Sequence, residues 1–211
     1  YGIMLSGDLY APKNIENAKL SAIAISGPFG AVKEQSSGLY ANQMAERGFI
    51  ALAFDPSFTG ESGGETRNIA SSDINTEDFS AAVDFLGLQK IGIIGICGFG
   101  GFALNATAVD KRVKAVATTS MYDIPRVSSN GYNDKVTVEE RTKMLEKLSL
   151  QRWKDAEKGT PEYGGKTNQD TLKGNEPQFI KEYFDYYKTP RGFHPRSINS
   201  NGAWATTSAM S

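Results

Sequence analysis

Cys97 is the residue best placed to do chemistry, because it follows a buried strand and precedes a glycine-rich helix start. The stretch IGIIGICGFGG, residues 91–101, predicts a strand over 91–96 that runs into a tight turn at Cys97. Gly95 leaves the space that a strained turn needs if a nucleophile is to stand clear of a sheet. A helix N-terminus also favours the thiolate form of a nearby sulfur. We therefore predict a cysteine nucleophile that faces a cleft.

Other interpretations of Cys97 stay open. Phe99 stands where the second glycine of such a turn is usual, and Gly100 and Gly101 come just after it. Cysteine is also a small side chain that packs well at a glycine-rich turn without any chemistry. A phosphate-binding loop is a further interpretation, but the G-x-x-x-x-G-K-[ST] pattern is absent here.

Two earlier turns could contribute to the same site. The turn SGPFG, residues 26–30, follows the apolar run 20–25 and could aim a backbone N–H at a reacting carbonyl oxygen. The turn DPSFTGESG, residues 55–63, follows the apolar run 49–54. Taken alone, each is equally an ordinary polar turn.

Strand and helix patterns alternate through the first half of the chain. This order predicts an α/β fold with a mostly parallel sheet that helices cover on both faces. For the clearest helix, 75–86, we expect Asn75 or Thr76 as the N-cap. The predicted strands are 3–9, 20–25, 49–54, 91–96 and 113–119, and the predicted helices are 37–47, 75–86 and 102–109.

The rhythm changes after about residue 125. Thr137 and Glu140 form a T-x-x-E capping box that opens a helix, and a second amphipathic helix is predicted over 176–188. We therefore divide the chain into the N-terminal part of a core (1–125), a helical insert that caps the site (126–196) and the start of a return to the core (197–211).

The insert is rich in aromatic residues and is the predicted substrate-facing part. Tyr186, Phe193 and His194 are the expected pocket residues. Phe179, Tyr183 and Tyr187 share one helical face, which we expect to pack against the core.

Composition narrows the classes of function. The net charge is −1, which excludes a broad electrostatic surface for nucleic acid or an anionic membrane. One cysteine and one histidine exclude an internal disulfide and Cys- or His-rich metal sites, so we predict no metal and no cofactor. No apolar run approaches the length of a membrane span.

The ends of the sequence suggest a longer protein. Tyr1 opens inside a predicted strand, and the last residues complete neither a helix nor a strand. We expect both ends to be cut and the C-terminal strands of the sheet to be missing. The compartment is left open, with a cytoplasmic one favoured, and so is the oligomeric state.

Three stretches together are similar to a known family. GPFGAVKEQSSGLYANQMAERGFIALAFDPSFTGESGGE, GICGFGGFALNATAVDKRVKAVATTSMYD and TPRGFHPRSINSNGAW resemble the YcjY-like branch of the α/β-hydrolase superfamily. This bacterial group is related to dienelactone hydrolases and polyketide transferases. The resemblance implies an α/β-hydrolase fold with Cys97 at the nucleophile position. It also implies an oxyanion hole from the Gly98 and Phe29 N–H groups, and a site-shaping loop at Asp55, Gly60 and Ser62.

The sequence departs from the family pattern at three places. Gly27 stands where relatives often have histidine, Phe99 narrows the turn, and the link 87–89 is short. The family's triad acid and histidine follow the last strands, which this sequence lacks. His194 matches the insert, so we predict that it does not reach Cys97 and that this chain alone is a poor catalyst. Asp123 is a candidate acid, or alternatively a helix cap.

These inferences predict an acyl hydrolase that acts on a small-molecule ester, thioester or lactone. Cys97 attacks the carbonyl, and water or another acceptor releases the acyl group. Three alternatives stay open: an acyl (polyketide) transferase, a non-catalytic fragment or degenerate relative without a base, and a redox-sensing thiol.

Overall fold

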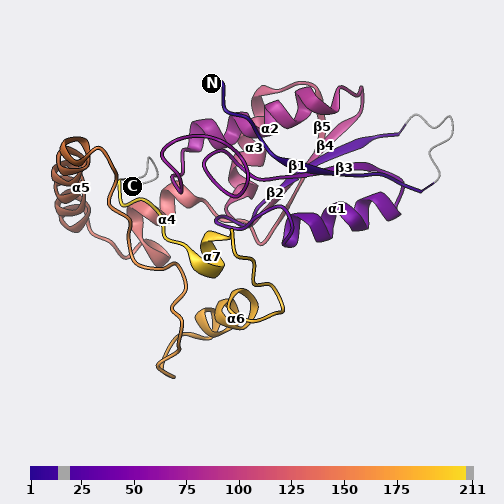
Figure 1. Ribbon diagram of the computed structural model, residues 1–211. Helices are drawn as coiled ribbons and strands as arrows, with labels where there is room; N and C mark the ends of the chain where they lie inside the picture. The colour runs from indigo at the N-terminus through magenta and orange to yellow at the C-terminus, as the bar shows by residue number, and fades with distance from the viewer. Residues whose placement is uncertain (14–19, 208–211) are drawn as a thin grey trace.

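The computed structural model describes residues 1–13 and 20–207, and its centre is one five-stranded sheet (Figure 1). The strands are β1 (Gly7–Tyr10), β2 (Ala22–Ser26), β3 (Ile50–Phe54), β4 (Ile91–Ile96) and β5 (Val113–Thr119). They lie in the order β1-β3-β2-β4-β5. Only β1 runs antiparallel to its neighbour, so the sheet is mostly parallel, as predicted.

Helices cover both faces of this sheet. Helix α1 (Ser36–Glu46) packs on one face, and α2 (Ser72–Leu86) and α3 (Phe99–Val109) pack on the other (Figure 1). Strand β2 shows why the faces separate: Ala22 and Ala24 join the core under α2 and α3, whereas Ile23 and Ile25 join the core under α1. Alternate residues of a strand point to opposite faces, so a strand buried on both sides reads as a continuous apolar run.

Three predicted boundaries move, each for a local reason. The segment before Gly7 bonds to a loop instead of a strand, with the Gly63 N–H donating to the Met4 carbonyl (2.8 Å). Helix α2 starts earlier because Ser71 is its N-cap and its Oγ accepts the Ile74 N–H; the expected cap Asn75 is buried inside the helix. Helix α3 begins at Phe99 and not at residue 102, directly after the turn at Cys97.

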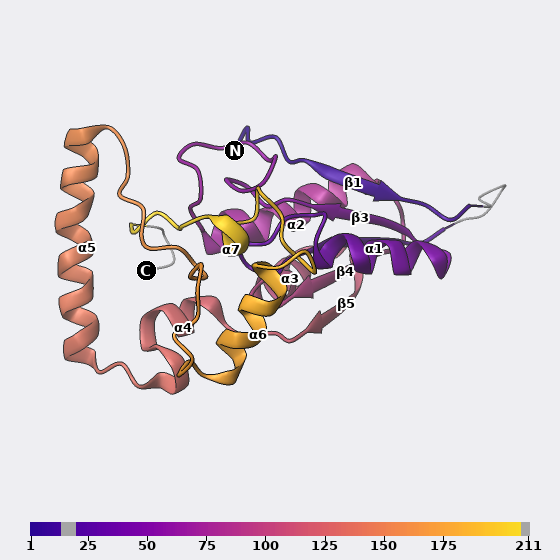
Figure 2. The same ribbon diagram turned by 60° about the horizontal axis from the view of Figure 1, so that its bottom comes forward.

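Helices dominate the chain after β5. They are α4 (Ile124–Asn130), a 3-10 turn (Tyr132–Asp134), α5 (Val138–Lys158), α6 (Gln178–Tyr187) and the short α7 (Ile198–Asn201). The capping box of α5 is present, with Thr137 and Glu140 bonding reciprocally at 3.2 and 2.9 Å. Helix α5 has no buried residue and stands away from the sheet (Figure 2). In the described ranges, no helix has the length and apolarity to span a bilayer.

Candidate active site around Cys97

Cys97 occupies the turn between β4 and α3. Its φ is +57°, a left-handed conformation that is strained for a residue with a side chain. Its N–H donates to the Thr119 carbonyl on β5 (2.9 Å), and its carbonyl accepts the Gly100 N–H (2.9 Å). The predicted strand-to-helix turn with a strained residue at its apex is therefore confirmed, while the role of Cys97 as nucleophile stays a prediction.

Gly95 is required by the close approach of α3 to the end of β4. A Cβ at this position would lie 2.6 Å from both the Ala103 Cβ and the Phe99 carbonyl oxygen. Helix α3 and strand β4 cannot move apart to make room for a Cβ without opening the core. Because glycine has no Cβ, it allows the tight turn at Cys97.

Gly95→Ala is expected to lower the free energy of unfolding by about 1–3 kcal/mol through overpacking. Gly92→Ala is the matched control on the same strand, because a Cβ there meets its first neighbour, the Ala115 carbonyl oxygen, at 3.4 Å. We expect that control to stay within about 0.5 kcal/mol of the wild type. Urea unfolding of the three proteins measures the difference, and equal losses in both variants would contradict the packing argument.

Cys97 is half-buried and lines a cavity of about 490 Å³ at the carboxyl ends of the strands. Turns after β2, β4 and β5 contribute Phe29, Cys97 and Tyr122, and helices from the second half of the chain close the other side. Open parallel sheets bind ligands at this edge. The remaining lining residues are Pro28, Ser36, Tyr40, Ile96, Thr119, Ser120, Thr167, Asn168, Ile180, Tyr183, Tyr187, Asn199 and Trp204.

Gly98, the residue after Cys97, packs against Phe29, which lines this cavity. A Cβ on Gly98 would be 3.3 Å from the Phe29 Cβ. Neither N–H has a hydrogen-bond partner among residues 1–13 and 20–207. Phe29 is fixed by Trp204, which stacks on its ring at 4.4 Å, and by Asn199, whose Nδ2 donates to the Phe29 carbonyl (2.8 Å). An oxyanion hole needs backbone donors without other partners near the nucleophile, and the assignment of these two amides to that role remains a prediction.

Three tyrosines surround Cys97. Tyr122, together with Tyr183 and Tyr187 of α6, lines the same cavity as Cys97, and all three phenols lie near enough to sense its charge. Burial, followed by the charge of Cys97, raises the pKa of all three phenols above the ordinary value. They therefore keep their protons at neutral pH. Sequence reasoning missed Tyr122, whose one signal was its position just after a strand that ends at the site.

The three predicted pocket residues of the insert, Tyr186, Phe193 and His194, are not among the residues that line the Cys97 cavity. Helix α6 turns Ile180, Tyr183 and Tyr187 toward the cavity, the face that we expected to pack against the core. Tyr186 points away from that face: it packs against Gly192 and lies 5.9 Å from the guanidinium of Arg191. The described cavity lining also lacks Phe193, which is 46% exposed.

His194 and Asp123 are not brought to Cys97. The His194 Nδ1 accepts the Arg196 N–H (3.3 Å) in the loop before α7. Asp123 is exposed and is the N-cap of α4, where its Oδ1 accepts the Arg126 N–H (3.0 Å). Asp123 thus has the helix-cap role that was its alternative. Within the described ranges, no histidine, aspartate or glutamate lines the cavity, and no three His, Cys, Asp or Glu side chains group as a metal site.

A buried charge cluster holds the turns after β2 and β3 together. Asp55 is fully buried, and its two oxygens accept the Lys33 N–H (2.7 Å) and the Glu61 N–H (2.9 Å). The Lys33 ammonium contacts Glu34 at 2.8 Å and Glu61 at 2.7 Å. Burial alone would lower the pKa of Lys33, but these hydrogen bonds outweigh it and raise the pKa. For Asp55 the balance is reversed. Burial raises the pKa of this carboxyl group, and the backbone hydrogen bonds and the charge of Lys33, which lower the pKa, do not outweigh burial.

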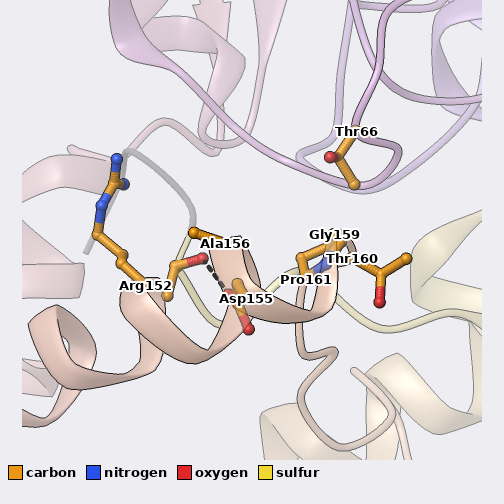
Figure 3. Close-up of a pocket in the computed structure, with 8 residues that line it drawn as sticks. Thr66, Arg152, Asp155, Ala156, Gly159, Thr160 and Pro161 are labelled. Atoms are coloured by element: carbon orange, nitrogen blue, oxygen red, sulfur yellow. Dashed lines mark hydrogen bonds between the residues drawn. The ribbon is translucent and has the colours of Figure 1, made fainter.

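A second cavity, of about 360 Å³, lies between α5 and the loop that contains Thr66 (Figure 3). It is lined by Arg152 and Asp155 of α5, and the Thr207 hydroxyl donates to Asp155 (3.0 Å). None of its lining residues borders the Cys97 cavity.

Several known proteins are similar to this chain in sequence, although no family model matches it. The uncharacterized protein PA2218 of Pseudomonas aeruginosa is 65% identical over the whole chain, and the chain covers 58% of that protein. The uncharacterized protein YcjY of Escherichia coli is 36% identical over 92% of the chain, which covers 65% of YcjY. The chain thus spans less than two thirds of the length of both. A thiohydrolase of Aspergillus aculeatus, aneE, is 33% identical over 54% of the chain, covering 37% of that protein.

Solved structures show the same fold. The crystal structure of PA2218 superimposes with a TM-score of 0.95 at 64% identity, covering 100% of this chain and 67% of that one. The α/β hydrolase GrgF from a Penicillium species superimposes with a TM-score of 0.68 at 22% identity, covering 93% and 71%.

Proposed function

Because this chain belongs to the α/β-hydrolase superfamily, in the branch that includes YcjY, we propose that Cys97 accepts an acyl group from a small-molecule substrate. The observation that carries the proposal is the placement of Cys97 at a strained turn on a cavity. The Phe29 and Gly98 amides, in the turns after β2 and β4, have no partner in the described ranges and support it. A nucleophile, an oxyanion site and room for a substrate are the minimum for acyl transfer.

The proposed reaction has two steps. The Cys97 thiolate attacks the substrate carbonyl carbon, a C–S bond forms, and the carbonyl electron pair moves to the oxygen beside the Phe29 and Gly98 amides. The leaving group departs and an acyl-Cys97 thioester remains. Water or another acceptor then attacks this thioester and releases the acyl group. The general base is assigned to no residue of the described ranges.

The cavity supports an ester, thioester or lactone of modest size as substrate. Its wall alternates aromatic rings with hydroxyl and amide groups, which suits an acyl chain that carries some oxygen. The similarity to a protein named as a thiohydrolase favours a thioester. Transfer to an acceptor other than water is the second candidate. The polyketide transferase claH of Penicillium crustosum is 25% identical over 92% of the chain, and the chain covers 58% of that protein.

The test is to trap the acyl group. After brief exposure to p-nitrophenyl acetate or an acetyl thioester at neutral pH, the intact protein should gain the mass of one acetyl group. Peptide mapping should place it on Cys97. An acetyl group elsewhere, or none, contradicts the proposal. Oxidation of Cys97 by peroxide without any acylation would instead support the redox-sensing alternative.

A further inference from the structure

The ring of Phe29 joins the aromatic core to the wall of the Cys97 cavity. Its centroid lies 6.3 Å from that of Phe99, which is 1% exposed and meets the Phe102 ring edge-on at 5.1 Å. Trp204, which lines the cavity together with Phe29, stacks on it with 4.4 Å between the centroids and 20° between the planes. The row of rings therefore begins in the core and ends with the indole of Trp204 at the cavity.

The backbone around Trp204 is tied to two separate parts of the molecule. The Trp204 carbonyl accepts the Gly164 N–H (2.9 Å), from the segment between α5 and α6. In the loop between β3 and α2, the Asn68 carbonyl accepts the Ala205 N–H (2.9 Å), and the Asn68 Nδ2 donates to the Ala203 carbonyl (3.2 Å). These bonds and the ring stack hold the indole in place before a ligand binds, which lowers the entropic cost of binding against it.

Rings from α6 line the same cavity. Tyr183 and Tyr187 have their ring centroids 6.3 Å apart and their planes at 73°. Aromatic rings prefer offset-stacked or edge-to-face contacts with one another, so a flat ring in this cavity has partners on Trp204 and on α6. The volume of about 490 Å³ is well above the roughly 150 Å³ of an apolar cavity that binds benzene. The cavity therefore has room for a ring, a short linker and a carbonyl group at Cys97.

We propose that the acyl group accepted at this site carries an aromatic ring, as a phenylacetyl group does, and that Trp204 is the specificity-determining residue that packs against this ring. The proposal rests on the proposed function of Cys97 as acyl acceptor and names the class of acyl group. Trp204 contacts a part of the substrate away from the reacting carbonyl, so it selects the substrate and takes no part in bond making.

Matched ligands separate the aromatic character of a ligand from its size. Phenylacetamide, cyclohexylacetamide and octanamide have the same number of carbon atoms and one neutral amide, and none transfers its acyl group readily to a thiol. A cavity that recognised apolar area alone would favour the two saturated ligands. Contact between aromatic rings adds about two- to tenfold in affinity, so phenylacetamide should bind more tightly than cyclohexylacetamide by about this factor.

Protection of Cys97 from iodoacetamide measures this binding. Each ligand is titrated against the wild type at constant pH, and the alkylated fraction is read from the intact mass. Each protein is compared with itself without ligand, so its basal thiol reactivity cancels. Half-protection at an about two- to tenfold lower concentration of phenylacetamide supports the proposal. Equal protection by the two cyclic amides, stronger protection by either saturated amide, or no protection by any of them overturns it.

Variants of the two tryptophans of the sequence assign the preference to a residue. Trp204→Leu should bring the ratio of the two cyclic amides' affinities to about one, whereas Trp204→Phe keeps a flat ring and should retain a preference for phenylacetamide. Trp153→Leu is the matched control, because Trp153 lies on α5, is 72% exposed and does not line the cavity. It should keep the wild-type ratio.

An unchanged ratio in Trp204→Leu overturns the role of Trp204. Thermal unfolding shows whether each variant is folded. The wild-type ratio tests the class of ligand without any variant, so the proposal stays falsifiable if Trp204→Leu does not fold.

Acylation rates separate this proposal from the proposed function. If esters acylate Cys97 but p-nitrophenyl phenylacetate acylates it no faster than p-nitrophenyl cyclohexylacetate, the class of acyl group is wrong while the function stands. If no ester or thioester acylates Cys97, the proposed function fails. The protection ratios then still decide whether the cavity prefers an aromatic ring.

Discussion

Cys97→Ala is expected to abolish acyl-enzyme formation and to reduce acyl hydrolysis by this chain to the background rate. Covalent catalysis cannot proceed without its nucleophile. No second cysteine is present in the sequence to substitute for it. Release of p-nitrophenolate and intact mass after p-nitrophenyl acetate treatment measure the two effects.

The difference between Cys97→Ala and the wild type reports on the thiol group alone, because alanine keeps the Cβ of cysteine. The strained backbone at φ +57° is the same in both proteins, so the free energy of unfolding should change little. Cys97→Ser provides an oxygen in the same place and should retain more activity than alanine. Hydrolysis that survives in Cys97→Ala at the wild-type rate would place the chemistry at another residue.

Asp55→Ala is expected to lower the free energy of unfolding by about 3–5 kcal/mol, the cost of removing one partner from a buried ion pair. The substitution leaves the Lys33 and Glu61 amides without their acceptors. It also removes a carboxylate 3.9 Å from the Lys33 ammonium, whose side chain is only 4% exposed. Urea unfolding at neutral pH measures the loss.

Asp185→Ala is the matched control, since it removes the same side chain from an exposed ion pair. Asp185 contacts Arg191 at 2.7 Å, and the two side chains are 64% and 67% exposed. Exposed ion pairs contribute about 0–1 kcal/mol. A loss in Asp55→Ala no larger than in this control would show that the turns after β2 and β3 are held by other contacts.

The sequence by itself determined the layered core and the turn at Cys97. Continuous apolar runs over β2, β3 and β4 require burial on both faces, so helices must cover both sides of the sheet wherever the strands lie. The turn at Cys97 and the capping box of α5 were equally readable, because both depend on residues within a few positions of one another. The division into core, insert and return segment stays our prediction.

Only the tertiary structure decided which side chains meet at the cavity. The helical period correctly placed Tyr183 and Tyr187 on one face of α6. The period does not determine what that face contacts, and in the structure these two residues line the cavity, whereas Tyr186 does not. The β4–β5 register brings Tyr122 to the same cavity as Cys97, and the β2–β3 pair brings Asp55 to the Lys33 amide. Contacts of this kind join segments far apart in the chain. They depend on strand order and register, which the packing of the whole molecule sets and which local spacing does not encode.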